Sequence, residues 1–125
     1  MTKEFIPYEE ALALKELGFD EPCFGYYTDR KLFTFQDENG EAWLHSDIQA
    51  PLYQQAFRWF REKYNLHKEI IWDHSEPIIW YYTISKMGDL EFENISSYPD
   101  KVFNIPEEAE LECLKQLIKI VKEKK

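Results

Sequence analysis

Three histidines and the aspartates near them are the side chains of this sequence best suited to acid–base or metal chemistry. His45 and Asp47 stand two residues apart, Asp73 and His74 are adjacent, and His67 precedes them in the same segment. Imidazole and carboxylate groups are common zinc ligands, but no spacing here matches a metal-binding motif and no helical i, i+4 pair is present. We therefore predict no catalytic residue and no metal ligand. A small metal-dependent hydrolase or transferase is kept as an alternative, which requires the fold to bring these residues together.

The two cysteines offer little more. Cys23 follows Pro22 in a predicted loop where it can be exposed, and a Cys–His dyad is open to it, but nothing like a nucleophile elbow surrounds it. Cys113 falls on the apolar face of a predicted helix and is interpreted as an inert core residue. Two cysteines make neither a disulfide framework nor a metal site. The four glycines are scattered, so no phosphate-binding loop and no cofactor is predicted.

Aromatic residues are unusually frequent, at 17% of the chain, with 9 Phe, 8 Tyr and 4 Trp. One small domain has difficulty burying so many rings, and Tyr and Trp are enriched at protein interfaces. We expect a remaining patch, rimmed by carboxylates, to contact a protein partner or a second copy of the chain. The residues predicted for this contact are Trp43, His45, Tyr26 and Tyr27.

The charge balance opposes nucleic-acid binding. The formal net charge is −9, from 24 acidic and 15 basic residues, and no basic stripe offsets it. The cluster Arg58, Arg61, Lys63 and Lys68 is interpreted as the solvated side of an amphipathic helix. A mimic of nucleic acid that inhibits a host DNA-binding protein is kept as an alternative. No apolar run is long enough for a signal peptide or a membrane span, so we expect a cytoplasmic protein with both cysteines reduced.

The strongest structural pattern is an amphipathic helix predicted over residues 47–64. Pro51 suits its first turn, and Lys63 is the one charged residue on its apolar side, where its stem can lie along the surface. A helix with so much aromatic area on one side must pack against another element. The apolar positions are Leu52, Tyr53, Ala56, Phe57, Trp59, Phe60 and Tyr64.

Other patterns predict two more helices and two hairpins. Helices should begin at Pro7, with Gly18 ending the first and Phe19 packing back on it, and at Pro106. Strands 31–37 and 41–45 flank a predicted Asn-Gly turn, and strands 69–73 and 78–84 form the second hairpin. The face shared by Phe33, Phe35, Ala42 and Leu44 is predicted to be the core face.

Strand 78–84 is apolar on both sides, which is typical of a central strand covered twice. A fifth strand is predicted over residues 90–95. The fold is therefore predicted to be α+β, one domain over residues 1–125, in the order α-β-β-α-β-β-(β)-α. Its antiparallel sheet of four to five strands is packed by the central helix and the two terminal helices.

Three motifs resemble a family of small uncharacterised proteins from Bacteroides-type gut bacteria and their phages and prophages. They are Ala11–Asp20 (ALALKELGFD), Ser46–Pro51 (SDIQAP) and Ala56–Glu62 (AFRWFRE). The resemblance covers about the first two-thirds of the chain, and after Ile84 the sequence departs from the family pattern. It implies an accessory role in a mobile element and brings no known activity. We expect a non-enzymatic protein-binding module.

Overall fold

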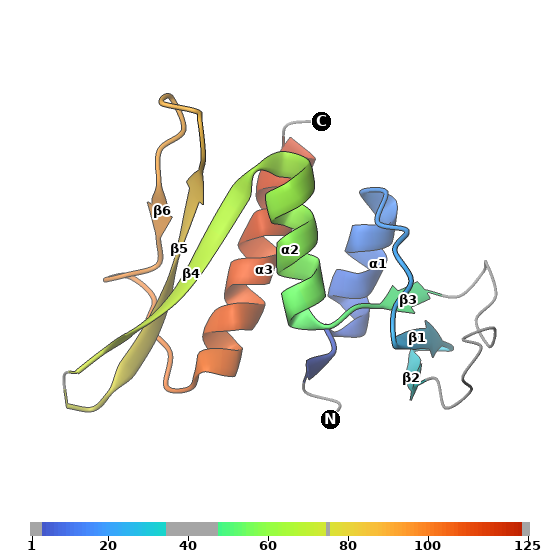
Figure 1. Ribbon diagram of the computed structural model, residues 1–125. Coiled ribbons are helices and arrows are strands. Elements are labelled where there is room, and N and C mark those ends of the chain that lie inside the picture. Colours follow the sequence, from blue (N-terminus) through green and yellow to red (C-terminus); the bar gives the residue numbers. More distant parts are fainter. Residues whose placement is uncertain (1–3, 35–47, 75, 124–125) are drawn as a thin grey trace. The chain divides into compact units, whose positions relative to one another are not determined.

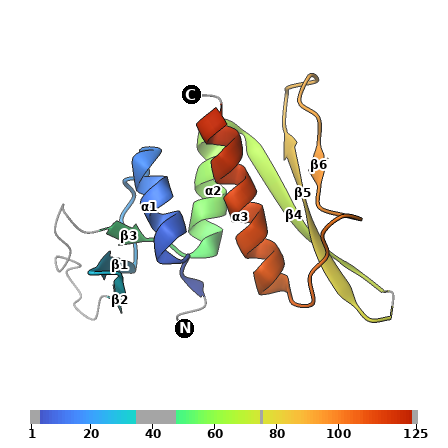
Figure 2. The ribbon, with the colours of Figure 1, turned by 180° about the vertical axis from the view of Figure 1, so that it is seen from behind.

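The computed structural model describes residues 4–34, 48–74 and 76–123. These ranges contain three helices and six strands, which Figures 1 and 2 show from two sides. The chain divides into two compact units, Met1–Ala56 and Phe57–Lys125, with the boundary inside the second helix. The helices are α1 (Tyr8–Glu16), α2 (Tyr53–Tyr64) and α3 (Pro106–Glu123). The strands are β1 (Gly25–Thr28), β2 (Lys31–Thr34), β3 (Ile48–Ala50), β4 (Leu66–Asp73), β5 (Ile79–Lys86) and β6 (Ile95–Ser96).

The first unit combines α1 with a small antiparallel sheet in the order β2-β1-β3. The central strand β1 places Tyr27 opposite Leu32 on one side and Ile48 on the other. Tyr27 is buried, and its hydroxyl donates a hydrogen bond of 2.7 Å to the carbonyl of Ile6. A buried hydroxyl with its partner in place fixes the sheet to the segment before α1.

Helix α1 ends as predicted. Gly18 has a φ of 103°, a left-handed conformation that glycine adopts at little cost. The N–H of Phe19 donates to the carbonyl of Leu14 at 2.9 Å, and the N–H of Gly18 donates to that of Lys15 at 3.0 Å. Phe19 itself is buried. This is the glycine-terminated helix end that the sequence indicated.

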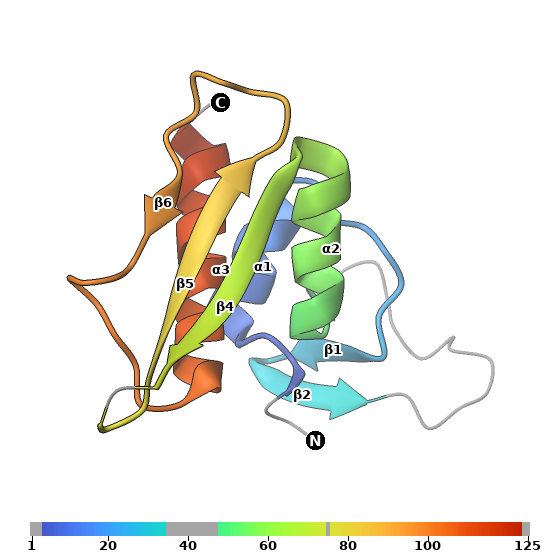
Figure 3. The same cartoon turned by 60° about the vertical axis from the view of Figure 1, so that its left-hand side comes forward.

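The second unit is built on the antiparallel sheet β4-β5-β6. Strands β4 and β5 pair along their full length, from Leu66 opposite Lys86 to Asp73 opposite Ile79. Helix α3 packs on one face of this sheet, seen behind β4 and β5 in Figure 3. Its wide apolar side is the one predicted, and its buried residues are Ala109, Cys113, Leu114, Leu117, Ile118, Ile120 and Val121.

Helix α2 continues directly into β4. Asn65, with a φ of 61°, makes the turn between them in the left-handed region that asparagine tolerates. The Lys63 ammonium lies 5.1 Å from the centre of the Trp59 ring and 5.7 Å from that of Tyr64. The one charged residue on the apolar side therefore runs along the aromatic surface, as predicted.

The α+β class is confirmed, but the prediction of one sheet with four to five strands is wrong. The described residues form two three-stranded antiparallel sheets instead. Strand β1 was not predicted, and β3 lies inside the helix predicted over 47–64, which begins only at Tyr53. Residues 48–50 are extended because they pair with β1. The helical preference of so short a segment is weak, and the hydrogen bonds of the sheet stabilise the extended conformation more.

Two further strand predictions need correction. Strand β2 confirms the first part of segment 31–37, but its partner among the described residues is β1, and the rest of that hairpin lies outside them. Phe33, predicted in the core, is 44% exposed. The predicted fifth strand is reduced to β6, and Leu90 lies in a turn before it, fully exposed. The alternation of residues 90–95 predicted a full strand there, but in this segment only Ile95 and Ser96 pair with β5.

Within the described ranges, no helix is long and apolar enough to span a membrane. The expectations of a single domain and of a cytoplasmic location stay predictions.

A candidate docking face on the second sheet

The residues weighed for catalysis do not meet in the described structure. His67 lies near the start of β4, while Asp73 and His74 lie at its other end. At about 3.3 Å per residue, His67 and His74 are therefore roughly 20 Å apart. Across the described ranges, no group of three or more His, Cys, Asp or Glu side chains is placed to hold a metal ion. His45 and Asp47 lie outside the described residues.

Both cysteines are buried rather than reactive. Cys23, predicted in a loop where it can be exposed, is only 7% exposed, and its thiol donates a 3.4 Å hydrogen bond to the carbonyl of Glu21. Burial, reinforced by the negative charge of Glu21, raises the pKa of Cys23 to about 12. Burial likewise raises the pKa of Cys113, which has no exposed surface, to about 12. Neither thiol is a nucleophile at neutral pH.

We expect the folded protein to react very slowly with a thiol reagent such as Ellman's reagent at pH 7.5. A rise of three pKa units from the ordinary value of 9.0 lowers the thiolate fraction about a thousandfold. Unfolding in guanidinium should expose two fast-reacting thiols per chain. Absorbance at 412 nm follows both stages, and one thiol that reacts within seconds in the folded protein would contradict the buried position of Cys23 or Cys113.

The residues predicted for partner contact have different surroundings. Tyr27 is buried, with its hydroxyl bonded to Ile6, so it has little surface to offer. Tyr26 is half-buried and stacks on Phe33, with ring centres 5.6 Å apart. Trp43 and His45 lie outside the described residues. The prediction that these residues contact a partner is not tested.

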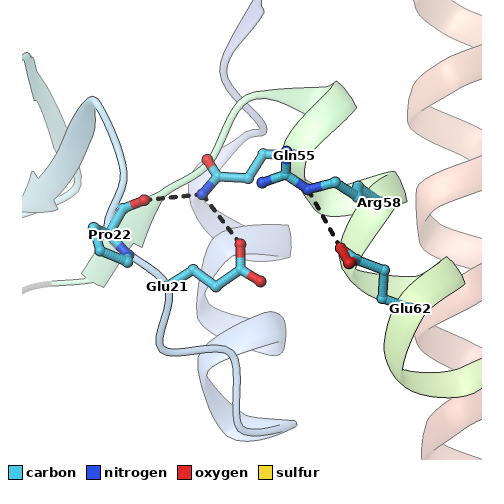
Figure 4. A network of polar contacts seen from close by, with 5 residues as sticks. All are labelled: Glu21, Pro22, Gln55, Arg58 and Glu62. Atoms are coloured by element: carbon cyan, nitrogen blue, oxygen red, sulfur yellow. Dashed lines mark hydrogen bonds and ion pairs between the residues drawn. The ribbon is translucent and has the colours of Figure 1, made fainter.

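Basic residues on and after α2 are engaged within the chain. Arg58 and Glu62 form an exposed i, i+4 ion pair at 3.5 Å (Figure 4), and the Lys68 ammonium lies 4.9 Å from the centre of the Phe57 ring. On the same helix, Gln55 donates to the carbonyl of Pro22 at 2.9 Å and to the carboxylate of Glu21 at 3.4 Å (Figure 4). The contacts of Gln55, Arg58 and Glu62 suit the solvated side of an amphipathic helix, whereas Lys68 lies over a ring on its apolar side.

Strand β5 presents apolar side chains on both faces of the sheet, and the two faces differ in burial. As predicted, it is the central strand of its sheet. Tyr82 and Ile84 point to the face on which α3 packs, and both are buried. Tyr81 and Ile79 alternate with them and point to the opposite face, where they remain half-buried. No described element of the second unit covers that opposite face, onto which Figure 3 looks.

The open face consists of Ile71, Ile79, Tyr81 and Tyr98. Ile71 lies directly opposite Tyr81 on the neighbouring strand. Tyr98, from the segment after β6, is 48% exposed, and its ring centre is 5.3 Å from that of Tyr81. Phenol rings beside two isoleucines make a surface suited to apolar contact and hydrogen bonding at once. The surrounding polar residues on this face are Glu69, Asp73, Thr83 and Ser96.

Two of the four residues of the open face, Ile79 and Tyr81, follow from the sequence pattern. The alternation of residues 78–84 placed Ile79 and Tyr81 on one side of a two-sided strand, but it predicted that side to be covered. Tyr98 is brought back to the sheet by the backbone hydrogen bond from the N–H of Ser97 to the carbonyl of Tyr82, at 3.0 Å. No local pattern signals that bond.

Comparison of the chain with protein-family models, with curated proteins and with solved structures finds no match.

Proposed function

We propose that this protein is a non-enzymatic protein-binding module that uses the open face as its contact surface. The observation that carries the proposal is the two-sided apolar character of β5, of which the described unit covers one side. The motif resemblance adds the context of an accessory factor of a mobile element.

The open face has the chemistry of an interface centre. Tyrosine is enriched at such centres because its ring supplies apolar area with few rotatable bonds, and its hydroxyl supplies a hydrogen bond. Complete burial of one large apolar side chain is favourable by about 1.5–3 kcal/mol. The four side chains of the open face are already partly covered, so each would contribute a part of that amount. Together they can support a specific complex.

The rim indicates what kind of partner fits. Glu69 lies opposite Thr83 at one side of the open face, and Asp73 lies opposite Ile79 at the other. Charges at the rim affect association rate and specificity more than affinity. An apolar partner surface with lysine or arginine at its edge therefore complements this face, in a chain whose net charge is −9.

The proposal is tested by affinity capture from a bacterial extract with the wild-type chain and with a Tyr81→Thr/Tyr98→Thr variant. Threonine keeps the strand preference of position 81 and removes both rings. A partner that binds the open face should be captured at least about tenfold less by the variant, because loss of a central interface tyrosine commonly costs more than 1.4 kcal/mol. The captured protein is then purified, and its Kd for both chains is measured by calorimetry.

Phe24→Ser is the matched control. Phe24 is 70% exposed and belongs to the first unit, so its replacement removes an exposed ring and leaves the four side chains of the open face unchanged. Capture by this control should equal that of the wild type. Equal capture by the wild type and the double-threonine variant would refute the assignment of the binding surface.

A further inference from the structure

Among the described residues, the sheet of the second unit has one long edge whose backbone groups pair with no other strand. In the order β4-β5-β6, β4 is an outer strand of eight residues, whereas β6 has only two. The pairing of β4 with β5 runs without a bulge, and β4 contains neither proline nor glycine. Proteins usually protect an exposed edge with a short strand, a proline, a bulge or charged side chains. The β6 side is protected by its short length, whereas β4 is long and carries only the last of these devices, the charges of Lys68, Glu69 and Asp73.

The hydrogen bonds of β5 identify which groups of β4 point outward. The N–H and carbonyl of Trp80 both bond to Phe103 at 2.8 Å, and the carbonyl of Tyr82 accepts from Ser97 at 3.0 Å. The backbone N–H and carbonyl groups of even-numbered β5 residues therefore point away from β4. Those of odd-numbered β5 residues point toward β4. In an antiparallel pair, two residues that lie directly opposite each other either both direct their backbone N–H and carbonyl groups toward the partner strand or both direct them away from it. The outward backbone groups of β4 are thus those of Leu66, Lys68, Ile70 and Trp72.

We propose that this edge pairs with the same edge of a second copy of the chain, antiparallel, to form one continuous six-stranded sheet. The hydrogen bonds of this contact are made by the β4 backbone, and the open-face residues on β5 and after β6 (Ile79, Tyr81 and Tyr98) take no part in it. Trp72, which is 47% exposed, lies at this edge and becomes covered in the pairing. Its ring lies beside Trp80 and His74, with ring centres 6.3 Å and 4.2 Å away.

Among the symmetric registers centred on Glu69, Ile70 and Ile71, charge favours the one centred on Ile70. When the twofold axis of the pair passes between the two copies of Ile70, Glu69 lies opposite Ile71 of the second copy, and His67 lies opposite Asp73 of the second copy. When the axis passes between the two copies of Ile71, Glu69 lies opposite Asp73 of the second copy. When it passes between the two copies of Glu69, these two carboxylates lie opposite each other. Like charges directly opposite each other are destabilising.

The mass of the wild-type chain, measured by sedimentation equilibrium over a range of concentrations, tests the pairing itself. We expect a reversible dimer. The Ile71→Lys variant tests the register: two new lysines would each meet Glu69 of the other copy, and the dimer Kd should fall by about twofold to tenfold. In the Ile71-centred register the same lysines would face each other and weaken the dimer. A wild-type chain that stays monomeric at millimolar concentration, or a dimer weakened by Ile71→Lys, overturns the proposal.

Two further variants separate backbone from side-chain effects. Ile70→Pro removes an outward N–H that β5 does not use, so it should abolish the dimer, while Ile70→Thr trims the side chain, keeps that N–H and should leave a dimer. The Tyr81→Thr/Tyr98→Thr variant should also remain dimeric, because its changes lie on the open face. If that variant alone becomes monomeric, the open face is the self-contact and the edge pairing is wrong. A monomeric wild type that still captures its partner through the open face refutes only the edge pairing.

Discussion

Replacement of Phe60 by alanine should lower the free energy of unfolding by about 3–5 kcal/mol, the usual cost of deleting a fully buried phenylalanine. Phe60 has no exposed surface. Its ring lies edge-on to that of Trp59, with centres 5.1 Å apart, and 6.1 Å from that of Tyr64. The loss combines the transfer free energy of the ring with the cavity left among its neighbours. Urea unfolding followed by circular dichroism measures it.

Arg61→Ala provides the control for this change. Arg61 follows Phe60 on α2 and is exposed, so its replacement by alanine should alter the free energy of unfolding by no more than about 0.5 kcal/mol. If Phe60→Ala and Arg61→Ala had similar effects, position 60 would not be part of the core.

Ser97→Ala should destabilise the protein by about 1–3 kcal/mol, although it removes only one oxygen atom. Ser97 is 6% exposed, and its hydroxyl oxygen accepts a hydrogen bond from the buried N–H of Tyr82 at 3.1 Å. Alanine fits the space but leaves that N–H without an acceptor. The cost is the desolvation of an unpaired donor, and thermal unfolding followed by calorimetry or circular dichroism measures it.

The neighbouring serine is the matched comparison. Ser96 is exposed, and its hydroxyl accepts from the N–H of Tyr98 at 3.2 Å where water can replace it. Ser96→Ala should therefore cost no more than about 0.5 kcal/mol. A cost for Ser97→Ala as small as this would mean that the Tyr82 N–H finds another partner.

Elements with a strong local pattern were predictable from the sequence. The apolar periodicity of α3, the Gly18 end of α1 and the antiparallel hairpin β4–β5 follow from residues close together in the chain. Each is fixed by side-chain spacing or by a residue with a special backbone preference, and both are visible locally.

The first sheet was not predictable in this way. Its strands β1 and β3 have four and three residues, too few to show alternation. They are stabilised by pairing across a separation of more than twenty residues, with Tyr26 opposite Gln49. Such pairing depends on what the rest of the fold brings together. The position of Tyr98 on the open face was not predictable for the same reason, because its ring reaches Tyr81 only where the chain returns to β5.

The unequal lengths of the two edges of the second sheet have a consequence for assembly size. Growth of a sheet into a filament needs two edges per molecule, one for each neighbour. Strand β6 offers only Ile95 and Ser96, too short a template for another strand. Pairing through β4 is isologous, with the same residues on both copies, and it consumes the one long edge of each. Such an assembly is complete as a dimer, because the paired sheet has no long edge left to which a third chain can add.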